Sequence, residues 1–230
     1  MVSYLGTVVM NKCYGENLID LFPTERRGRL FVVGASGAGK TELVTKIVRK
    51  YSCRFYRILI CGTLNHPIQD IPEVRDKVTV SKEIIDPEPE IDPFQKKKSF
   101  LIIYDDNFLS AANDESVANV FIKGRHLGIS AILISQNLFM QGKYARSISL
   151  NCTHFLLLKQ RDLGQIEVLG RQLYGREKAK VFLKAYKRAI DGKPYGYILA
   201  DVSITTPEEL SLRSNVADEG PCEVVYSWHE

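Results

Sequence analysis

The sequence predicts an α/β fold with a mostly parallel sheet flanked by helices. Short apolar runs suited to buried strands alternate with segments of helical spacing, which is typical of parallel sheets. The first unit, residues 30 to 48 (LFVVGASGAGKTELVTKIV), joins an apolar run, a glycine-rich turn and an amphipathic segment. The side chains with recognisable chemistry follow the ends of the apolar runs, where open α/β sheets bind their ligands.

The length of 230 residues favours one globular unit with elaborations. No apolar run approaches the roughly 20 residues that span a bilayer, and the N-terminus lacks the form of a secretory signal. We therefore expect a soluble intracellular protein that is not secreted and has no membrane partner. The five cysteines include no C-x-x-C pair, so neither a zinc site nor a disulfide framework is indicated.

Residues 34 to 41 (GASGAGKT) match the P-loop pattern G-x-x-x-x-G-K-[ST] between a strand-like run and a helix-like one. The glycines let backbone N–H groups turn toward the β- and γ-phosphates of ATP, Lys40 reaches their oxygens, and Thr41 places a hydroxyl on Mg²⁺. A Gly/Ser-rich loop with a chance lysine is the alternative, which the agreement of motif and flanks disfavours. The expected nucleotide-binding residues are Gly34, Ala35, Ser36, Gly37, Ala38, Gly39, Lys40, Thr41 and Glu42.

A second signal is FLIIYDDN, residues 100 to 107, an apolar strand that ends in two carboxylates. This is the Walker B pattern. Asp105 is expected to hold the Mg²⁺ shell through water, because Mg²⁺ keeps several waters and few protein ligands. Asp106 is expected to polarise the attacking water as general base. A helix N-cap pair is the structural alternative for two aspartates at a strand end.

The third signal is Gln136, at the end of the apolar strand AILISQN, residues 131 to 137. This position lies on the same predicted sheet edge as Asp105. A glutamine there can donate to the γ-phosphate and accept from the lytic water, so it reports whether the nucleotide is intact. Capping of the following loop is the alternative role. Together the three signals predict a P-loop NTPase core of the ASCE, RecA-like type.

The other elements divide the chain into an N-terminal leader (1–28) packed on the core, an ATPase domain (29–204) and an acidic C-terminal tail (205–230) that leaves the sheet. Within the domain, residues 63 to 99 are an irregular, proline-punctuated excursion in which only residues 78 to 80 look strand-like. Further strands are predicted at 55–62, 153–160 and 195–202, and helices after the P-loop, at 114–127, 162–173 and 176–190.

Charge is unevenly distributed along the chain, although the net charge is only +4. Residues 141 to 190 contain eleven Lys or Arg against three acids, a local balance of 11 − 3 = +8. Residues 201 to 230 contain seven acids against Arg213. Clustered Lys and Arg fit a polyanionic partner, because they neutralise phosphates and release counterions. A solvated helix surface is the other interpretation.

These motifs, with IKGRHLGISAILISQNLF, ARSISLNCTHFLLLKQ and LGRQLYG, resemble the viral genome-packaging ATPases of the FtsK–HerA superfamily. They are most similar to the FtsK-like ATPases of polinton-like and adintovirus-type DNA viruses, and more distantly to poxvirus packaging ATPases. The resemblance covers roughly residues 29 to 215. It implies a homo-oligomeric ring that translocates double-stranded DNA, independently of sequence, into a preformed capsid at a portal or vertex. The implied location is the host cell nucleus or a viral assembly site.

Carried over from the family, the P-loop keeps its phosphate role, Asp105 its magnesium role and Gln136 its sensor role. Many members place glutamate after the Walker B aspartate, whereas this chain has the shorter Asp106. Such rings also borrow an arginine from the neighbouring subunit to stabilise phosphoryl charge. Arg146 is the preferred candidate, in a polar loop beyond the sensor strand. Arg125 could instead be a cis contact or a helix C-terminal charge, and either could be a surface arginine without a functional contact.

Three other functions remain open from the sequence. A different FtsK- or HerA-type translocase, or a helicase-like ATPase, would use the same chemistry on another cargo. A P-loop small-molecule kinase would need an arginine-rich lid and an acceptor pocket. A nucleotide-binding assembly module would show no turnover, even with DNA and Mg²⁺ present.

Overall fold

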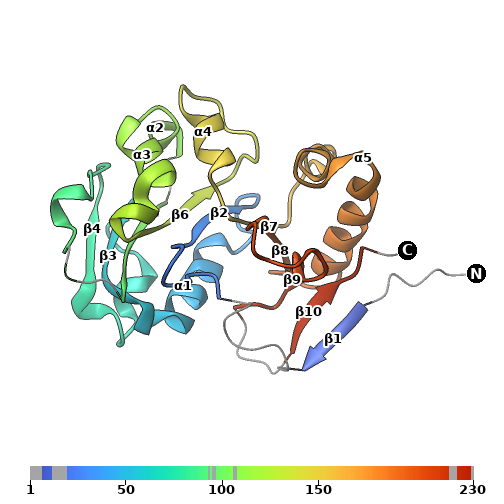
Figure 1. The fold of residues 1–230 in the computed structure, drawn as a ribbon, viewed down its shortest axis with the longest axis horizontal. Helices are drawn as coiled ribbons and strands as arrows, with labels where there is room; N and C mark the ends of the chain where they lie inside the picture. The colour runs from blue at the N-terminus through green and yellow to red at the C-terminus, as the bar shows by residue number, and fades with distance from the viewer. Residues whose placement is uncertain are drawn as a thin grey trace, which may run out of the picture.

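The computed structural model describes residues 7–11, 20–92, 94, 97–105, 108–217 and 222–228, and a single sheet forms its centre (Figure 1). In these residues the sheet has 10 strands in the spatial order β1-β10-β9-β8-β7-β2-β6-β5-β3-β4. In chain order they are β1 (Thr7–Asn11), β2 (Arg29–Val33), β3 (Phe55–Cys61), β4 (Val78–Ser81), β5 (Ser99–Tyr104), β6 (Ile129–Ser135), β7 (His154–Leu158), β8 (Tyr197–Asp201), β9 (Leu212–Ser214) and β10 (Cys222–Tyr226).

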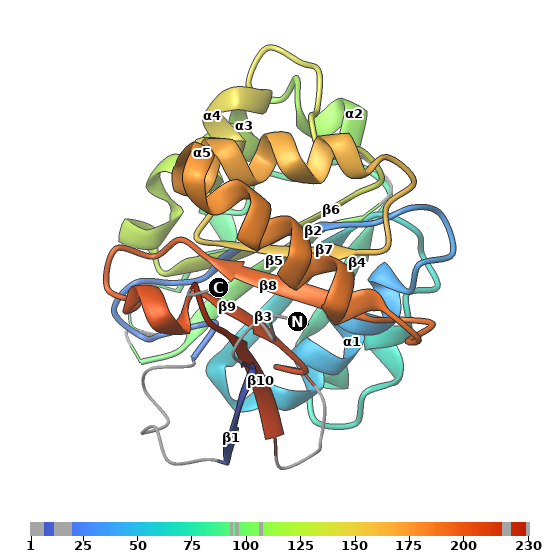
Figure 2. The ribbon, with the colours of Figure 1, turned by 90° about the vertical axis from the view of Figure 1, so that its right-hand side faces the viewer.

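Helices cover both faces of the sheet. They are α1 (Lys40–Lys50), α2 (Phe108–Ala111), α3 (Glu115–Lys123), α4 (Ala145–Leu150) and α5 (Leu163–Ile190). α1 packs on one face, where Val44 and Ile47 join one apolar cluster, and the other helices lie on the opposite face (Figures 1 and 2). There Phe121 of α3 and Phe182 of α5 join a second cluster. This arrangement confirms the α/β fold class with a mostly parallel sheet. None of the helices in the described part of the chain is long and apolar enough to cross a membrane.

The parallel part of the sheet runs β7-β2-β6-β5-β3-β4. The predicted strands at 55–62, 131–137 and 153–160 occur here as β3, β6 and β7, because their apolar residues are buried on both sheet faces. β6 lies between the P-loop strand β2 and the acidic strand β5. The ends of these three strands therefore meet at one edge of the sheet, where the predicted chemistry lies.

Four strands extend the sheet beyond β7 in antiparallel fashion, in the order β8, β9, β10 and β1. The prediction that the acidic tail leaves the sheet is wrong, because β9 and β10 belong to it. Their apolar residues Leu212, Val225 and Tyr226 are buried, whereas the acids that dominated the composition, such as Glu208 and Glu209, are exposed in the connecting turn. β1 lies within the predicted leader and pairs with β10.

The two helices predicted at 162–173 and 176–190 are the two halves of α5. They meet at Gly175, whose φ of 81° and ψ of 172° interrupt the helical conformation. Glycine adopts this positive φ without a Cβ penalty. The excursion at residues 63–99 contains the predicted strand, β4, which pairs with β3 and closes one edge of the sheet.

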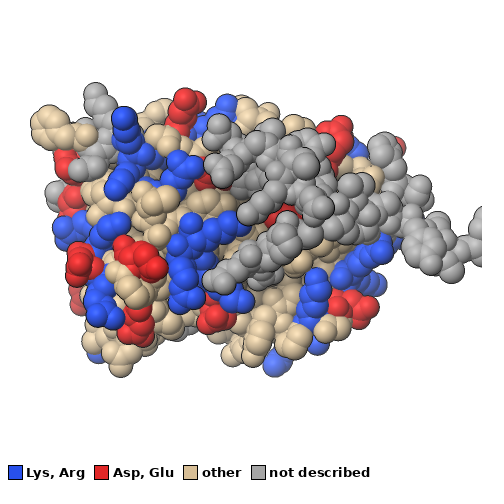
Figure 3. Space-filling model, turned by 90° about the horizontal axis from the view of Figure 1, so that it is seen from below, with Lys and Arg blue, Asp and Glu red and all other residues tan. Residues whose placement is uncertain are grey.

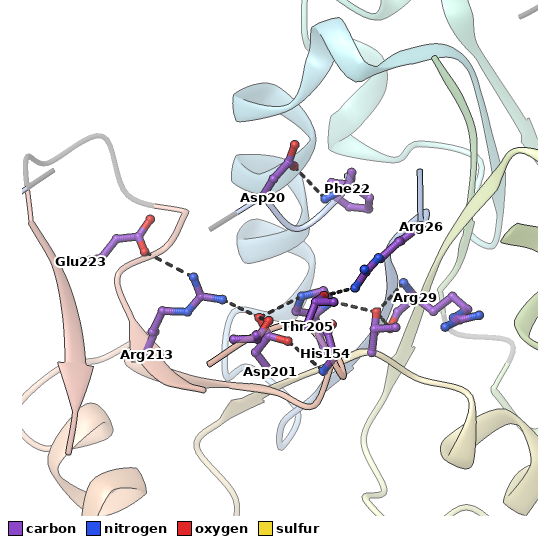
Figure 4. Close-up of polar contacts among 12 residues, drawn as sticks. Asp20, Phe22, Arg26, Arg29, His154, Asp201, Thr205, Arg213 and Glu223 are labelled. Carbon is purple, nitrogen blue, oxygen red and sulfur yellow. Dashed lines mark hydrogen bonds and ion pairs between the residues drawn. The ribbon is translucent and has the colours of Figure 1, made fainter. Parts of the chain in front are cut away.

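A buried ionic network connects the parallel and antiparallel parts of the sheet (Figure 4). Arg213 Nη2 lies 2.8 Å from Asp201 Oδ2, and His154 Nε2 lies 3.5 Å from the same oxygen. Asp201 also accepts from the Ser203 N–H and the Thr206 hydroxyl. Burial alone would raise the pKa of the Asp201 carboxyl, but His154 and Arg213 hold this pKa well below its usual value. The carboxylate thus joins the first residue of β7, the last of β8 and the middle of β9.

Asp201→Asn should lower the free energy of unfolding by about 3–5 kcal/mol, because it leaves the buried Arg213 charge with only Glu223, whose Oε2 lies 4.0 Å from Arg213 Nη1. Urea denaturation measures the loss, and Glu209→Gln, an exposed site with the same charge change, is the control. Since the pKa of Asp201 is depressed in the folded chain, its contribution is present above about pH 4 and is lost as pH falls further. Equal stabilities of the two variants at neutral pH would contradict this role.

Candidate nucleotide site

The glycine-rich loop is tied to the ends of both strands that flank β2. The Gly34 N–H donates to the Ser135 carbonyl at the end of β6, with an N···O distance of 3.3 Å. The Ala35 N–H donates to the Lys159 carbonyl just after β7, at 3.0 Å. Within the loop, the Ala38 N–H donates to the Ala35 carbonyl at 3.1 Å. The loop conformation is therefore fixed by the sheet before any ligand arrives.

Gly39 is the residue at which the loop becomes helix α1. Its φ of 89° lies in the left-handed region, and no side chain caps the first turn of the helix. A Cβ at this position would also lie 2.6 Å from Cδ1 of Tyr195, so glycine is required on two counts. The uncapped N–H groups and the positive end of the helix dipole face the loop, which is the arrangement that binds phosphate.

Lys40, the first residue of α1, folds back over the loop. Its Nζ donates to the Gly34 carbonyl at 2.9 Å and to the Ala35 carbonyl at 3.0 Å. These bonds hold the ammonium group against the start of the loop. The motif predicts that this group contacts phosphate oxygens when a nucleotide is bound.

Thr41 and Asp105 come together from two different elements. The Thr41 hydroxyl donates to Asp105 Oδ2 at 3.2 Å, and only 5% of Asp105 is exposed. A hydroxyl beside a carboxylate at a phosphate loop suits Mg²⁺, which prefers oxygen ligands. When bound, Mg²⁺ would neutralise charge on the β- and γ-phosphate oxygens. Asp106, the expected general base, lies outside the described residues.

His66 is a site residue that the sequence analysis missed. The Ile68 N–H donates to His66 Nδ1 at 3.3 Å, which assigns the ring proton to Nε2. Nε2 lies 3.3 Å from Asp105 Oδ2, so this imidazole donates to the same oxygen as Thr41. His66 is 3% exposed and lies in the loop after β3. It caps the 3-10 helix Pro67–Asp70, and the Gln69 side chain accepts from the His66 backbone N–H. His66 therefore helps to orient the Asp105 carboxylate from the loop after β3.

Gln136 follows β6 directly, and its neighbour Ser135 pairs with Val33 of β2. This register places Gln136 beside Gly34, at the start of the P-loop, with its side chain exposed. Glu42, in the first turn of α1, is also exposed. The structure thus gathers the P-loop, Asp105 and Gln136 at the carboxyl edge of the parallel strands. Their individual roles stay predictions.

The two candidate arginines belong to different elements, and Arg125 lies away from this edge. Arg125 belongs to a 3-10 turn, η5 (Gly124–Leu127), that precedes β6. The seven residues of β6 therefore separate it from Gln136 by about 23 Å of strand, too far to contact the nucleotide of its own subunit. Arg146 is exposed in the first turn of α4. For Arg125 a contact with nucleotide therefore requires a second subunit.

His66→Gln should lower the affinity of the nucleotide site for Mg²⁺ by about 10–100-fold. This is the usual effect of losing a partner that orients a metal ligand. The measurement is a titration of Mg²⁺ against binding of a fluorescent ATP analogue, which needs no turnover. His126→Gln, at an exposed histidine, is the control. Identical Mg²⁺ titrations for the two variants, with both folded by circular dichroism, would refute the orienting role.

Both the sequence and the fold of this chain are similar to those of known proteins. A family model described as the poxvirus A32 protein matches residues 24–205, whereas no curated protein matches the chain at a significant level. The fold is similar to the genome packaging NTPase B204 from Sulfolobus turreted icosahedral virus 2, in complex with AMP (TM-score 0.56, 13% identity, 82% of this chain and 96% of that one). The AMPPCP complex of B204 gives a TM-score of 0.55 at 13% identity, over 76% and 93% of the two chains.

EssC (ATPases 2 and 3) from Geobacillus thermodenitrificans is also similar, with a TM-score of 0.50, 11% identity and coverage of 88% of this chain and 40% of that one. At these identities the structural matches establish the fold alone. The family match spans the P-loop, Asp105 and Gln136 and covers most of the chain. The chain therefore belongs to the poxvirus A32 protein family, which confirms its resemblance to the viral packaging ATPases of the FtsK–HerA superfamily.

Proposed function

We propose that this protein is an ATP-hydrolysing motor subunit that translocates double-stranded viral DNA into a preformed capsid. The observation that carries the proposal is the arrangement of Lys40, Thr41 and Asp105 at one sheet edge, with the Gln136 strand between the P-loop and acidic strands. Membership of the poxvirus A32 protein family supports the same conclusion.

In this proposal each side chain has a separate task. Lys40 and the loop N–H groups hold the β- and γ-phosphates, and Thr41 and Asp105 hold Mg²⁺. Asp106 accepts a proton from the attacking water, and Gln136 contacts that water and the γ-phosphate. His66 keeps Asp105 oriented. Hydrolysis of ATP by water then gives ADP and phosphate. Gln136 loses its contact with the γ-phosphate, and this loss signals that the nucleotide has been hydrolysed.

The active form in this proposal is a homo-oligomeric ring. Arg125 lies before β6, at the other end of that strand from Gln136, so it can stabilise phosphoryl charge only on the nucleotide of a neighbouring subunit. Arg146 remains the preferred candidate, because its exposed position on α4 leaves it available to a neighbour. The site would then be complete only at a subunit boundary.

DNA contacts in the proposed motor are directed to phosphates and independent of sequence. α5 exposes six basic side chains, Arg171, Arg176, Lys180, Lys184, Lys187 and Arg188. Positive charge is not confined to α5, because Lys and Arg also gather in the middle of the face seen from below, with Asp and Glu beside them (Figure 3). B204, a similar fold, is by name a genome packaging NTPase. A capsid portal or vertex is the proposed partner, in the host nucleus or at a viral assembly site.

The proposal is tested by ATP hydrolysis with and without double-stranded DNA. We expect turnover that needs Mg²⁺ and is stimulated by DNA of any sequence. Lys40→Ala should reduce turnover to background, since it removes the charge that contacts the phosphates, whereas Arg49→Ala, an exposed position on the same helix, should leave turnover unchanged. Thermal unfolding of both variants controls for misfolding. Wild-type turnover in Lys40→Ala would refute the P-loop assignment.

The same assay separates the other functions. Phosphate transfer to a nucleoside in place of water would indicate a small-molecule kinase. Nucleotide binding without turnover, even with DNA and Mg²⁺, would indicate an assembly module. DNA-stimulated turnover with strand separation would indicate a helicase-like ATPase.

A further inference from the structure

A pocket of about 860 Å³ lies at the sheet edge opposite the P-loop. Its walls are the segment before β2, Arg125 of η5, the start of β7 and the loop after β8. β2 runs five residues from Arg29, in the pocket wall, to the residue before Gly34, which corresponds to about 16 Å of strand. The pocket is therefore separate from the nucleotide site.

Arginines dominate the charged side chains of this pocket. Its acidic residues are few, and two of them already have partners. Asp20 lies 2.7 Å from Arg54, and Asp201 belongs to the buried network with Arg213. The third acid is Glu25, which is exposed. The arginines of the wall are Arg26, Arg27, Arg29, Arg54 and Arg125. The pocket thus carries an excess of positive charge.

Arg29 and Arg125 present guanidinium donors that the fold does not satisfy. Arg29 Nε is buried and has no hydrogen-bond partner, and Arg29 Nη1 reaches only the Phe121 carbonyl, at 3.4 Å. Arg125 donates from Nε to His126 Nε2, which leaves its terminal nitrogens available. Among the ion pairs within the described ranges, none includes either arginine. In Figure 4 the Arg29 side chain points away from Asp201.

Burial and the nearby charge of Arg125 both act on the Arg29 guanidinium. Burial lowers the pKa of Arg29 below its usual value, and the positive charge of Arg125 lowers it further. An anion bound near both guanidinium groups would offset this repulsion. Guanidinium groups bind phosphate in bidentate fashion, with a geometry that matches its oxygens.

The rim of the pocket adds an apolar component. Leu150 and Ile204, both in the pocket wall, are 73% and 98% exposed. An inorganic ion would leave these side chains in water, whereas a larger ligand would cover them. We propose that this pocket is a second phosphate site, which binds a phosphate ester between Arg29 and Arg125. The backbone of a nucleic acid and a free nucleotide share this chemistry.

The test compares Arg125→Gln with Lys123→Gln in full-length protein that also carries Lys40→Ala to weaken the P-loop. Lys123 is exposed, loses the same charge and does not line the pocket. Isothermal titration calorimetry measures the affinity for AMP and for a short blunt DNA duplex. We expect Arg125→Gln to weaken one of the two by about tenfold, the effect of losing one charged hydrogen-bonding pair, and Lys123→Gln to leave both unchanged.

The outcome identifies the source of the phosphate. A loss confined to AMP indicates a nucleotide, and a loss confined to the duplex indicates a nucleic-acid backbone. Equal affinities of the two variants for both probes would overturn the proposal. Arg29→Gln provides a second test, at the partly buried arginine. If Arg29→Gln fails to fold, the comparison of Arg125→Gln with Lys123→Gln still tests the proposal. Because the assay needs no ATP turnover, its failure is distinguishable from failure of the proposed motor activity.

Discussion

The structure of the site depends on one buried carboxylate, that of Asp105. Burial makes a carboxylate without hydrogen-bond partners costly. Thr41 from the P-loop helix and His66 from the loop after β3 both donate to its Oδ2 atom. These two contacts join three elements that are distant in sequence. The candidate magnesium ligand, the phosphate loop and the end of β3 are consequently held as one unit.

The sheet order explains why this unit forms where it does. β6 separates β2 from β5, and the Gly34 and Ala35 N–H groups tie the loop to β6 and to the residue after β7. The opposite edge of the same strands has a different character, with arginines and few unpaired acids. One sheet thus presents a phosphate loop with the Asp105 carboxylate at one edge and guanidinium groups at the other.

The strands of the parallel core could be predicted, because segments such as 131–137 are continuously apolar. The position of the P-loop could be predicted because its motif is contiguous in the sequence. His66 could not, since it acts across 39 residues of chain and lies in a section that appeared irregular. β9 and β10 were missed because residues 205–230 are acidic in overall composition. The apolar residues that bury these strands occur only in short runs, which composition does not reveal. The pocket was missed because its arginines come from segments that only the fold brings together.

In the proposed motor, a neighbouring subunit completes the nucleotide site. The most direct measurement is electron cryomicroscopy of the protein with double-stranded DNA and a non-hydrolysable ATP analogue. The account predicts a ring around DNA with one nucleotide at each subunit boundary, bound to the P-loop of one subunit and close to an arginine of the next. Monomers that enclose the nucleotide entirely within one chain would contradict it.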